Sequence, residues 1–291
     1  MVTVAFFGYR AFTRFHFPAD TSWPLPELQW NHQQDIAFRG ARPQIIGHRG
    51  SGVESSDGRL VIGKAISAVR TGIASGVDWI EIDIRATRAP DSQLVVFHDE
   101  TIDRKTTGEG AVSELSIADL NAARIHVDPL ERIPTLDDVF NEFHDQQVGW
   151  IFDIKANGID EQVLEWLETK IKNGELTREH VILFGTYDIL LDYRDSGFAL
   201  GYTAVWGLFG NCPRILFHQS SILDHCDELE CDYLVLPVIF ANPSILDAAD
   251  AAGLNVWVYG VNDPRDMNYL TVRGATGFIT DFPEKLIATL D

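Results

Sequence analysis

The sequence predicts an α/β protein built as a single (β/α)8 TIM barrel with an irregular N-terminal extension. From about residue 44, short apolar runs typical of buried strands alternate with amphipathic segments typical of helices. This alternation indicates a parallel sheet, and the number of runs indicates that the sheet closes into a barrel. The chain has 291 residues, and a barrel of this kind needs roughly 250. We therefore predict an extension over residues 1–40, packed on the barrel, and a barrel domain over residues 41–291.

Nine runs have the character of strands, although a barrel needs only eight. They are residues 44–46, 77–80, 94–97, 150–152, 181–184, 198–205, 233–236, 256–261 and 278–279. The link from Asp83 to Leu94 is too short to hold a crossover helix. One of the nine runs must therefore join the sheet in another way.

Helical spacing separates several of these runs. Residues 62–75 place Ile66, Val69 and Ile73 on one face, and residues 160–171 are also amphipathic. Further helices are expected to start at residues 116 and 135. Residues 1–40 are rich in aromatic residues and prolines and show no period, which predicts an irregular arm.

Composition excludes several classes of partner. Hydrophobic residues make up 45% of the chain, and the formal net charge is −20. Such an acidic surface repels nucleic acid and anionic lipid. No apolar run approaches the roughly 20 residues that span a bilayer. We predict neither a nucleic-acid partner nor a stable membrane association.

The cysteines favour a reducing compartment. Cys212, Cys226 and Cys231 are odd in number and lie late in the chain, so a disulfide framework is not expected and a cytoplasmic location is the simpler interpretation. Cys226 and Cys231, together with His218 and His225, could be read as a zinc site. Their spacing matches no common zinc site, so we do not favour that interpretation.

Polar side chains stand at the carboxyl ends of three early strand-like runs. His48 follows residues 44–46, Glu81 follows residues 77–80, and His98 follows residues 94–97. An α/β barrel builds its active site from such positions. Glu81 and Asp83 project to the same side of a strand, and two carboxylates that close together repel unless a cation lies between them. Oxygen ligands suit a hard ion such as Mg²⁺ or Ca²⁺.

The order and spacing of the motifs resemble the glycerophosphodiester phosphodiesterase family from about residue 44 to residue 284. The matching segments are His48-Arg49-Gly50, Glu81-Ile82-Asp83, His98-Asp99 with Arg104 and Thr106-Thr107, Gly108–Leu115, Ile133–Leu136, Asp153-Ile154-Lys155, Val261–Pro264 and Ile279–Pro283. The resemblance implies a phosphoric diester hydrolase that converts small glycerophosphodiesters to sn-glycerol 3-phosphate and an alcohol such as choline or ethanolamine.

The chemistry of phosphodiester cleavage assigns roles to the matched residues. One divalent cation, Mg²⁺ or Ca²⁺, is expected on Glu81, Asp83 and Asp153. Arg49 and Lys155 are expected to neutralise the phosphoryl oxygens, which makes them both catalytic and substrate-binding. His48 and His98 are the nearby groups that titrate close to neutrality, so they are expected to form the acid–base pair.

Two aromatic residues are candidates for the wall of the substrate pocket. Trp257 and Tyr259 lie on one face of a predicted strand. Core packing is an equal alternative for Trp257. Tyr259 aligns with the family's tryptophan in W-T-V-N, which favours the pocket. Asn262 is expected either to contact substrate or, with slight preference, to cap the following helix. Asp281 is expected to hold the last turn of the barrel.

Two departures from the family pattern keep other functions open. Gly63-Lys64-Ala65 stands where the family has E-N-T, and Asp153 replaces a glutamate, as in the related sphingomyelinase D enzymes. The enzymatic alternative is a phospholipase D-like lyase acting on lysophospholipids, with an apolar mouth formed by Trp206, Leu208 and Phe209. The other alternative is a non-catalytic phosphodiester-binding descendant, in which Arg49 pairs with Glu81 and Lys155 with Asp153 as structural ion pairs.

Overall fold

The structure is a computed structural model that describes residues 42–51, 53–54, 60–61, 65–126, 130–204 and 219–290. Residues 38–291 form one compact unit, which contains the barrel. The predicted extension over residues 1–40 lies outside the described residues, as do Gly63, Cys212 and the apolar residues 206–209. The predictions made for these residues stay predictions.

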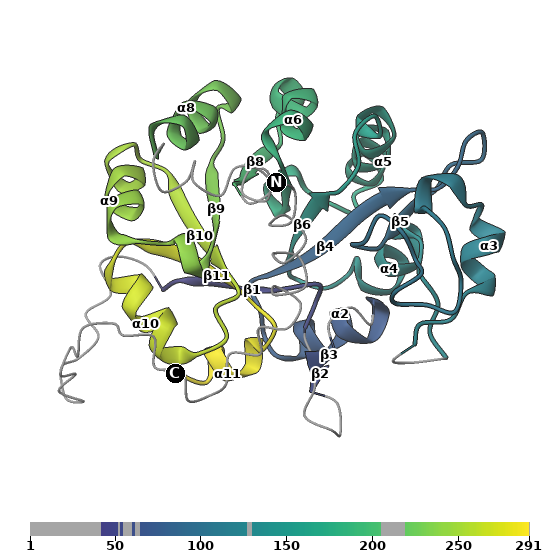
Figure 1. Ribbon diagram of the computed structural model, residues 1–291, viewed down its shortest axis with the longest axis horizontal. Helices are drawn as coiled ribbons and strands as arrows, with labels where there is room; N and C mark the ends of the chain where they lie inside the picture. Colours follow the sequence, from purple (N-terminus) through teal and green to yellow (C-terminus); the bar gives the residue numbers. More distant parts are fainter. Residues whose placement is uncertain are drawn as a thin grey trace, which may run out of the picture. The chain divides into compact units, whose positions relative to one another are not determined.

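Within the described chain, eight parallel strands form a closed ring (Figure 1). They are β1 (Gln44–Gly47), β4 (Trp79–Ala86), β6 (Gly149–Ile154), β7 (Val181–Gly185), β8 (Ala199–Thr203), β9 (Tyr233–Pro237), β10 (Asn255–Tyr259) and β11 (Ala275–Thr280). Each strand pairs with its neighbours in parallel, and β1 pairs with both β11 and β4, which closes the ring. The predicted (β/α)8 barrel is confirmed.

Helices follow most strands and cover the outside of the ring. They are α2 (Ala65–Ala74), α3 (Ile117–Ala122), α4 (Leu136–Phe143), α5 (Asp160–Lys172), α6 (Tyr187–Leu190), α8 (Gln219–Leu229), α9 (Pro243–Ala251), α10 (Pro264–Val272) and α11 (Pro283–Ile287). The short elements are β2 (Val53–Glu54), β3 (Leu60–Val61), η1 (Val112–Glu114), η2 (Arg178–His180), η3 (Leu191–Ser196) and η4 (Val238–Phe240). Among the helices described, none combines the length and apolar character needed to cross a bilayer.

The two helix starts expected from the sequence are real and carry capping boxes. Ser116 and Thr135 each accept a hydrogen bond from the backbone N–H three residues on, and the aspartate at that position bonds back to the cap. Each pair satisfies backbone donors that a helix start leaves free.

The ninth strand-like run is β5 (Leu94–Val96), and it is not a barrel strand. It pairs antiparallel with the last residues of β4, so that Ile84 faces Val96 and Ala86 faces Leu94. The short link between them cannot hold a helix, so the chain turns back on itself as a hairpin. The expectation that His98 follows a barrel strand is therefore wrong, although the returning hairpin still ends at the rim of the barrel.

An apolar layer fills the inside of the ring below its rim. Ile46, Ile151, Ile182, Phe184, Val235, Trp257 and Ile279 make up this layer. Trp257 is almost fully buried, and its ring packs against those of Phe184 and Tyr233. Core packing, one of the two roles open for Trp257, accounts for its surroundings. This layer forms the floor on which the polar residues at the rim stand.

Candidate active site

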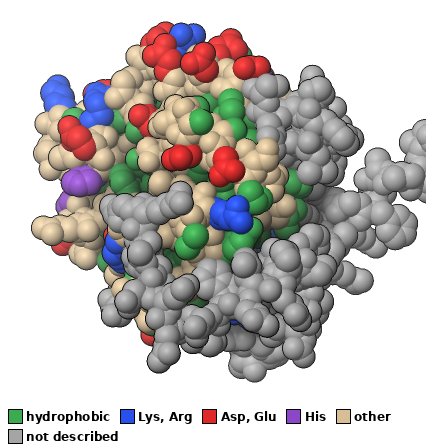
Figure 2. Space-filling view, turned by 90° about the vertical axis from the view of Figure 1, so that its left-hand side faces the viewer, with side chains coloured by type: hydrophobic (Ala, Val, Ile, Leu, Met, Phe, Trp, Pro, Cys, Tyr) green, Lys and Arg blue, Asp and Glu red, His purple; other side chains and the backbone are tan. Residues whose placement is uncertain are grey.

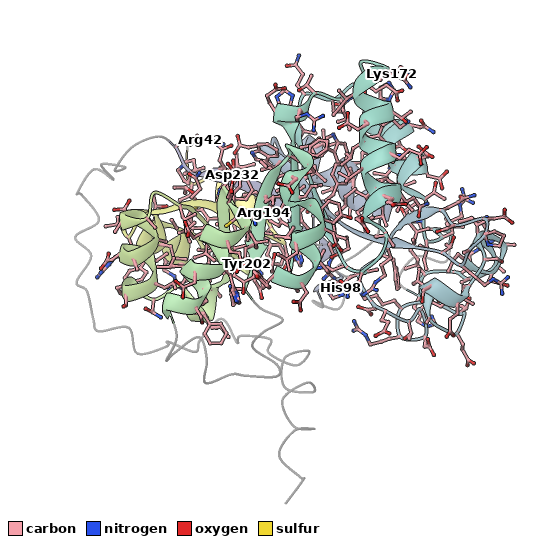
Figure 3. The ribbon with its side chains drawn as sticks, turned by 90° about the horizontal axis from the view of Figure 1, so that it is seen from above. Arg42, His98, Lys172, Arg194, Tyr202 and Asp232 are labelled. Carbon is pink, nitrogen blue, oxygen red and sulfur yellow. The ribbon has the colours of Figure 1, made fainter. Side chains whose placement is uncertain are left out.

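Three buried carboxylates meet at the carboxyl end of the barrel. Glu81 and Asp83 project to the same side of β4, and Asp83 lies opposite Asp153 of β6 in the strand register. Their ligand oxygens all lie within 4.8 Å of one another. In Figure 3 His98 lies at one edge of the barrel, and Arg42 and Asp232, which precede β1 and β9, lie toward the opposite edge. The predicted metal ligands are thus together, and they are on the expected face.

Two cations are packed against this cluster. Arg49 Nε lies 2.8 Å from Asp83 Oδ2, in an ion pair without hydrogen-bond geometry. Lys155 Nζ lies 2.5 Å from Asp153 Oδ2 and 3.4 Å from Asp83 Oδ1. The expected structural pair between Lys155 and Asp153 is therefore present. Glu81 instead accepts a hydrogen bond of 2.8 Å from the backbone N–H of Arg49.

The electrostatics of the cluster favour a further positive charge. Burial and the neighbouring Asp83 raise the pKa of Glu81 to about 7. Burial also acts against the charge on Asp83, but Arg49, His98 and Lys155 outweigh it and hold the pKa of Asp83 well below its usual range. A bound divalent cation would stabilise the ionised form of Glu81 and so return the pKa of Glu81 toward its usual range. The all-carboxylate donors fit a hard ion, so these residues fit the predicted Mg²⁺ or Ca²⁺.

The loop that carries His48 and Arg49 has a left-handed backbone. Arg49 has φ 52° and Gly50 has φ 86°, and the N–H of Gly50 donates to the carbonyl of Gly47. A Cβ on Gly50 would lie 2.4–2.6 Å from backbone atoms of Ala68 and Val69 in α2. Only glycine allows this close approach, which turns the side chains of His48 and Arg49 toward the rim.

His48 is oriented by a carboxylate from the last strand. Its Nδ1 lies 2.7 Å from Asp281 Oδ1, just beyond the end of β11. Burial alone would lower the pKa of His48, but the charge and hydrogen bond of Asp281 outweigh it and raise that pKa. Asn262 Nδ2 donates to the other oxygen of Asp281 at 3.0 Å. Because Nδ1 faces Asp281, Nε2 is the nitrogen left for a substrate.

His98 has a similar partner but the opposite electrostatic shift. Its Nδ1 lies 2.8 Å from Asp99 Oδ1, and Arg104 holds the other oxygen of Asp99 at 2.8 Å. Burial lowers the pKa of His98; the charge of Asp83 and the bond to Asp99 oppose this but do not overcome it. The pKa values of the two histidines are therefore shifted in opposite directions from the usual imidazole value.

A small cleft opens beside this histidine. It is lined by Arg49, Asp83, His98 and Lys105, with Ile82, Val96 and Phe97 as its apolar wall. Burial and the charge of Arg49 lower the pKa of Lys105 to about 8, and its Nζ lies 3.5 Å from Asp99 Oδ1. The cleft therefore presents two cations and an imidazole to an incoming anion.

Four polar residues have positions that the sequence did not predict. Asp99 and Lys105 belong to the H-D motif and its continuation, and this membership was the only sign in the sequence that they lie at the site. Asp281 orients His48 as well as ending the last strand. The preferred capping role of Asn262 is wrong, because Asp263 is the N-cap of α10 and accepts the N–H of Arg265. The side chain of Asn262 holds Asp281 instead.

Tyr259 stands at the end of β10, partly exposed and within the electrostatic reach of the carboxylates. Burial, and next the charge of Asp153, raise the pKa of its hydroxyl well above the usual range, so the phenol is neutral. This position is compatible with its predicted place in the pocket wall.

Comparison with known proteins agrees with this geometry. The model of the glycerophosphoryl diester phosphodiesterase family matches residues 48–197 and 219–285, which is more than half of the chain. The chain belongs to this family. Its fold and family make it a phosphoric diester hydrolase.

Relatives cover most of the chain at low identity. A glycerophosphodiester phosphodiesterase of Caldanaerobacter subterraneus is 29% identical over 257 residues, which are 84% of this chain and 96% of the relative. A human lysophospholipase D is 25% identical and covers 83% of this chain and 84% of its own length.

Solved structures share the fold. An Oleispira antarctica phosphodiesterase in complex with the product sn-glycerol-3-phosphate has a TM-score of 0.67 at 20% identity, covering 86% of this chain and 97% of its own. The glycerophosphodiester phosphodiesterase of Thermotoga maritima has a TM-score of 0.64 at 21% identity, covering 87% of this chain and 100% of its own.

Proposed function

We propose that this protein hydrolyses small glycerophosphodiesters to sn-glycerol 3-phosphate and an alcohol. The observation that carries the proposal is the pair of histidines, each held through Nδ1 by its own aspartate, beside three carboxylates and two cations. Family membership supports the substrate class. It also favours an enzyme over the non-catalytic alternative.

The carboxylates and the cationic side chains have different roles in binding the phosphate. Glu81, Asp83 and Asp153 would hold one Mg²⁺ or Ca²⁺, which when bound neutralises negative charge on the phosphoryl oxygens. Arg49 and Lys155 already lie against these carboxylates, so they add positive charge on the same side. They orient the phosphodiester for attack.

The opposite pKa shifts support an assignment of the acid and the base. His98, whose pKa is lowered, is neutral at pH 7 and can accept a proton. His48, whose pKa is raised, is the better proton donor to the leaving alcohol. Paired groups whose surroundings push their pKa values apart are the usual arrangement for acid–base catalysis.

The nucleophile in this proposal is the hydroxyl of the glycerol unit next to the phosphorylated oxygen. Because this hydroxyl is tethered to the phosphorus, its effective concentration is far above that of a free reactant. His98 would take its proton while His48 protonates the departing oxygen. A cyclic glycerol phosphate forms and water then opens it, with the histidine roles reversed.

A deoxy substrate tests this nucleophile. A glycerophosphodiester that lacks the neighbouring hydroxyl should be cleaved at least about a hundredfold more slowly, and it should still inhibit cleavage of the parent compound because its phosphate binds. Phosphorus NMR of the parent reaction should show a transient cyclic phosphate. Equal cleavage of the deoxy analogue would establish direct attack by water.

A substrate screen tests the function itself. Glycerophosphocholine, glycerophosphoethanolamine and lysophosphatidylcholine are incubated with Mg²⁺ or Ca²⁺, and glycerol 3-phosphate and released choline are measured. His98→Ala should lower turnover by about two to four orders of magnitude with the fold intact. The exposed His180, far along the chain on η2, supplies the matched control His180→Ala. Activity that survives both a chelator and His98→Ala would reject the proposed site.

Lysophospholipids remain the second candidate substrate. The human relative named a lysophospholipase D is one reason. Ile239, in η4 just after β9, is 51% exposed at the carboxyl end of the barrel, where an acyl chain could rest. In the screen, this candidate predicts choline release from lysophosphatidylcholine in preference to the water-soluble diesters.

The cytoplasmic location stays a prediction from the cysteine content.

A further inference from the structure

The end of α8 brings two cysteines side by side on the outside of the barrel. The N–H of Cys231 donates to the carbonyl of Cys226 at 3.0 Å, and the N–H of Glu230 donates to the carbonyl of Asp227 at 3.1 Å. Glu230 has a left-handed backbone with φ 52°. These bonds define a Schellman motif, which frequently brings the side chains of its first and last residues together. Here the two contacting residues are both cysteines.

The two thiols interact directly and are otherwise shielded. Cys226 is 1% exposed and Cys231 is 7% exposed, and both are free thiols. The interaction between the two thiols lowers the pKa of Cys231 and raises that of Cys226. Cys231 is therefore the better nucleophile, because the thiolate is the reactive form.

A surface pocket gives access to this pair. It is lined by Cys226 and Cys231, by the apolar residues Leu223 and Leu254, and by Asp227, Glu230 and Asp232. Acidic side chains gather along the upper edge of the face in Figure 2, at the height of α8. Glu230 pairs with Arg194 at 3.1 Å, so Asp227 and Asp232 supply most of the negative charge of the lining. This charge repels anions and leaves the pocket open to small uncharged molecules.

We infer that Cys226 and Cys231 form a modification site, a dithiol that an uncharged peroxide oxidises to an intramolecular disulfide. Cys231 sulfur attacks one peroxide oxygen, the O–O bond breaks, and one water leaves after proton transfer. Cys226 sulfur then attacks the sulfenic acid on Cys231, the S–O bond breaks, and the thiol proton of Cys226 leaves with the second water. Overall, two thiols and one hydrogen peroxide give one disulfide and two waters.

The bridge should form with little movement of the backbone. A disulfide spans Cα atoms roughly 4.4–6.8 Å apart, a range that suits residues joined by a backbone hydrogen bond such as that between Cys231 and Cys226. The bridge would link the end of α8 to the start of β9. Asp232, next to Cys231, lies toward the edge of the barrel opposite His98 in Figure 3. Oxidation should therefore leave turnover unchanged.

Thiol counting and intact mass test the site in the full-length Cys212→Ser protein, which keeps only these two cysteines. Hydrogen peroxide should consume both thiols together, lower the intact mass by that of two hydrogen atoms, and leave the protein unlinked to other chains. Peptide mapping should find one cross-link, which dithiothreitol removes. Oxygen added to either cysteine without a cross-link, or thiol loss only at the rate of global unfolding, would overturn the inference.

Alkylation by matched reagents tests the acidic pocket. Neutral iodoacetamide should label Cys231 faster than anionic iodoacetate by a ratio larger than for free cysteine, and salt should reduce the excess. Cys226→Ser should remain labelled at Cys231 yet fail to form the disulfide with peroxide. A ratio equal to that of free cysteine would show that the acidic lining does not select the reagent.

Discussion

At the residue scale, the surroundings of each side chain in the candidate site give groups of the same chemical type different pKa values. His48 and His98 each bond an aspartate through Nδ1, but the pKa of His48 is raised and that of His98 is lowered. Glu81 and Asp83 are two positions apart and are shifted in opposite directions as well. Burial, together with the charges of Arg49, Lys155 and Asp281, produces these differences.

Asp281→Asn tests how the pKa of His48 is set. Loss of the carboxylate charge removes the main influence that opposes burial, so the pKa of His48 should fall in an NMR titration of the imidazole. If His48 is the acid, the alkaline limb of the pH–rate profile should move to lower pH, and turnover should fall by about one to two orders of magnitude.

Asp263→Asn is the matched control, because Asp263 caps α10 and makes no bond to His48. This variant should leave both the imidazole titration and the alkaline limb in place. A pKa of His48 that falls in Asp281→Asn without any movement of the limb would remove His48 from the acid role.

At the element scale, the hairpin of β4 and β5 and the loop after β1 decide where the candidate catalytic groups lie. The N–H of Phe97 donates to the carbonyl of Asp83 at 3.0 Å, which brings the neighbouring His98 back to the carboxylates. The Gly47–Gly50 turn places Arg49 on the same carboxylates from the other side. Both devices are local, and both depend on close backbone contact.

Gly50→Ala tests the turn after β1. The new methyl group would meet backbone atoms of α2 at 2.4–2.6 Å, which cannot move aside as a flexible side chain can. We expect the free energy of unfolding in urea to fall by more than about 2 kcal/mol, with a loss of turnover as Arg49 is displaced.

Gly158→Ala is a control for backbone strain alone. Gly158 also has a positive φ of 71°, but a Cβ there would meet nothing within 4 Å. Its cost should be about 1 kcal/mol, from the left-handed backbone only. Equal costs for the two alanines would mean that the contact with α2 is not what restricts residue 50.

At the scale of the whole molecule, closure of the ring is what assembles the site. The pairing of β1 with β11 places His48 beside Asp281, which is 233 positions away in the chain. The same closure buries the carboxylate cluster, and burial is the first cause of the raised pKa of Glu81. The stability of the fold and the charge state of the site are therefore linked.

A divalent cation should stabilise the fold more at pH 8 than at pH 6. The folded pKa of Glu81, about 7, is above its usual value of 4.5, so the stability due to its neutral form is complete below 4.5 and is lost as the pH rises through 7. A cation binds the ionised form and offsets that loss. At a hundred times its dissociation constant it adds about 2.7 kcal/mol, or roughly 5 to 10 °C in melting temperature.

Calorimetry with Mg²⁺ or Ca²⁺ at the two pH values checks this expectation. Glu81→Gln, which cannot ionise, should show a smaller stabilisation with little dependence on pH in this range. If the cation raises the melting temperature of the unaltered protein equally at both pH values, ionised Glu81 is not a ligand of the ion.

The sequence alone determined the barrel and most of the candidate site, because these follow from local patterns. Strand residues alternate between faces, and parallel strands end at one rim. The sequence alone could therefore place Glu81, Asp83 and Asp153 together, as they are in the structure. The same patterns predicted where α3 and α4 start. Local spacing was sufficient in each case.

Only the tertiary structure decided the partners and the protonation of these groups. The hydrogen bonds that Asp281 accepts from His48 and Asn262 depend on ring closure, which no local pattern encodes. The ninth strand-like run, β5, pairs antiparallel with β4 and does not enter the barrel. In the folded chain, Lys105 lines the cleft beside His98. The pKa of a side chain depends on its burial and on the charges around it, and both are properties of the folded chain.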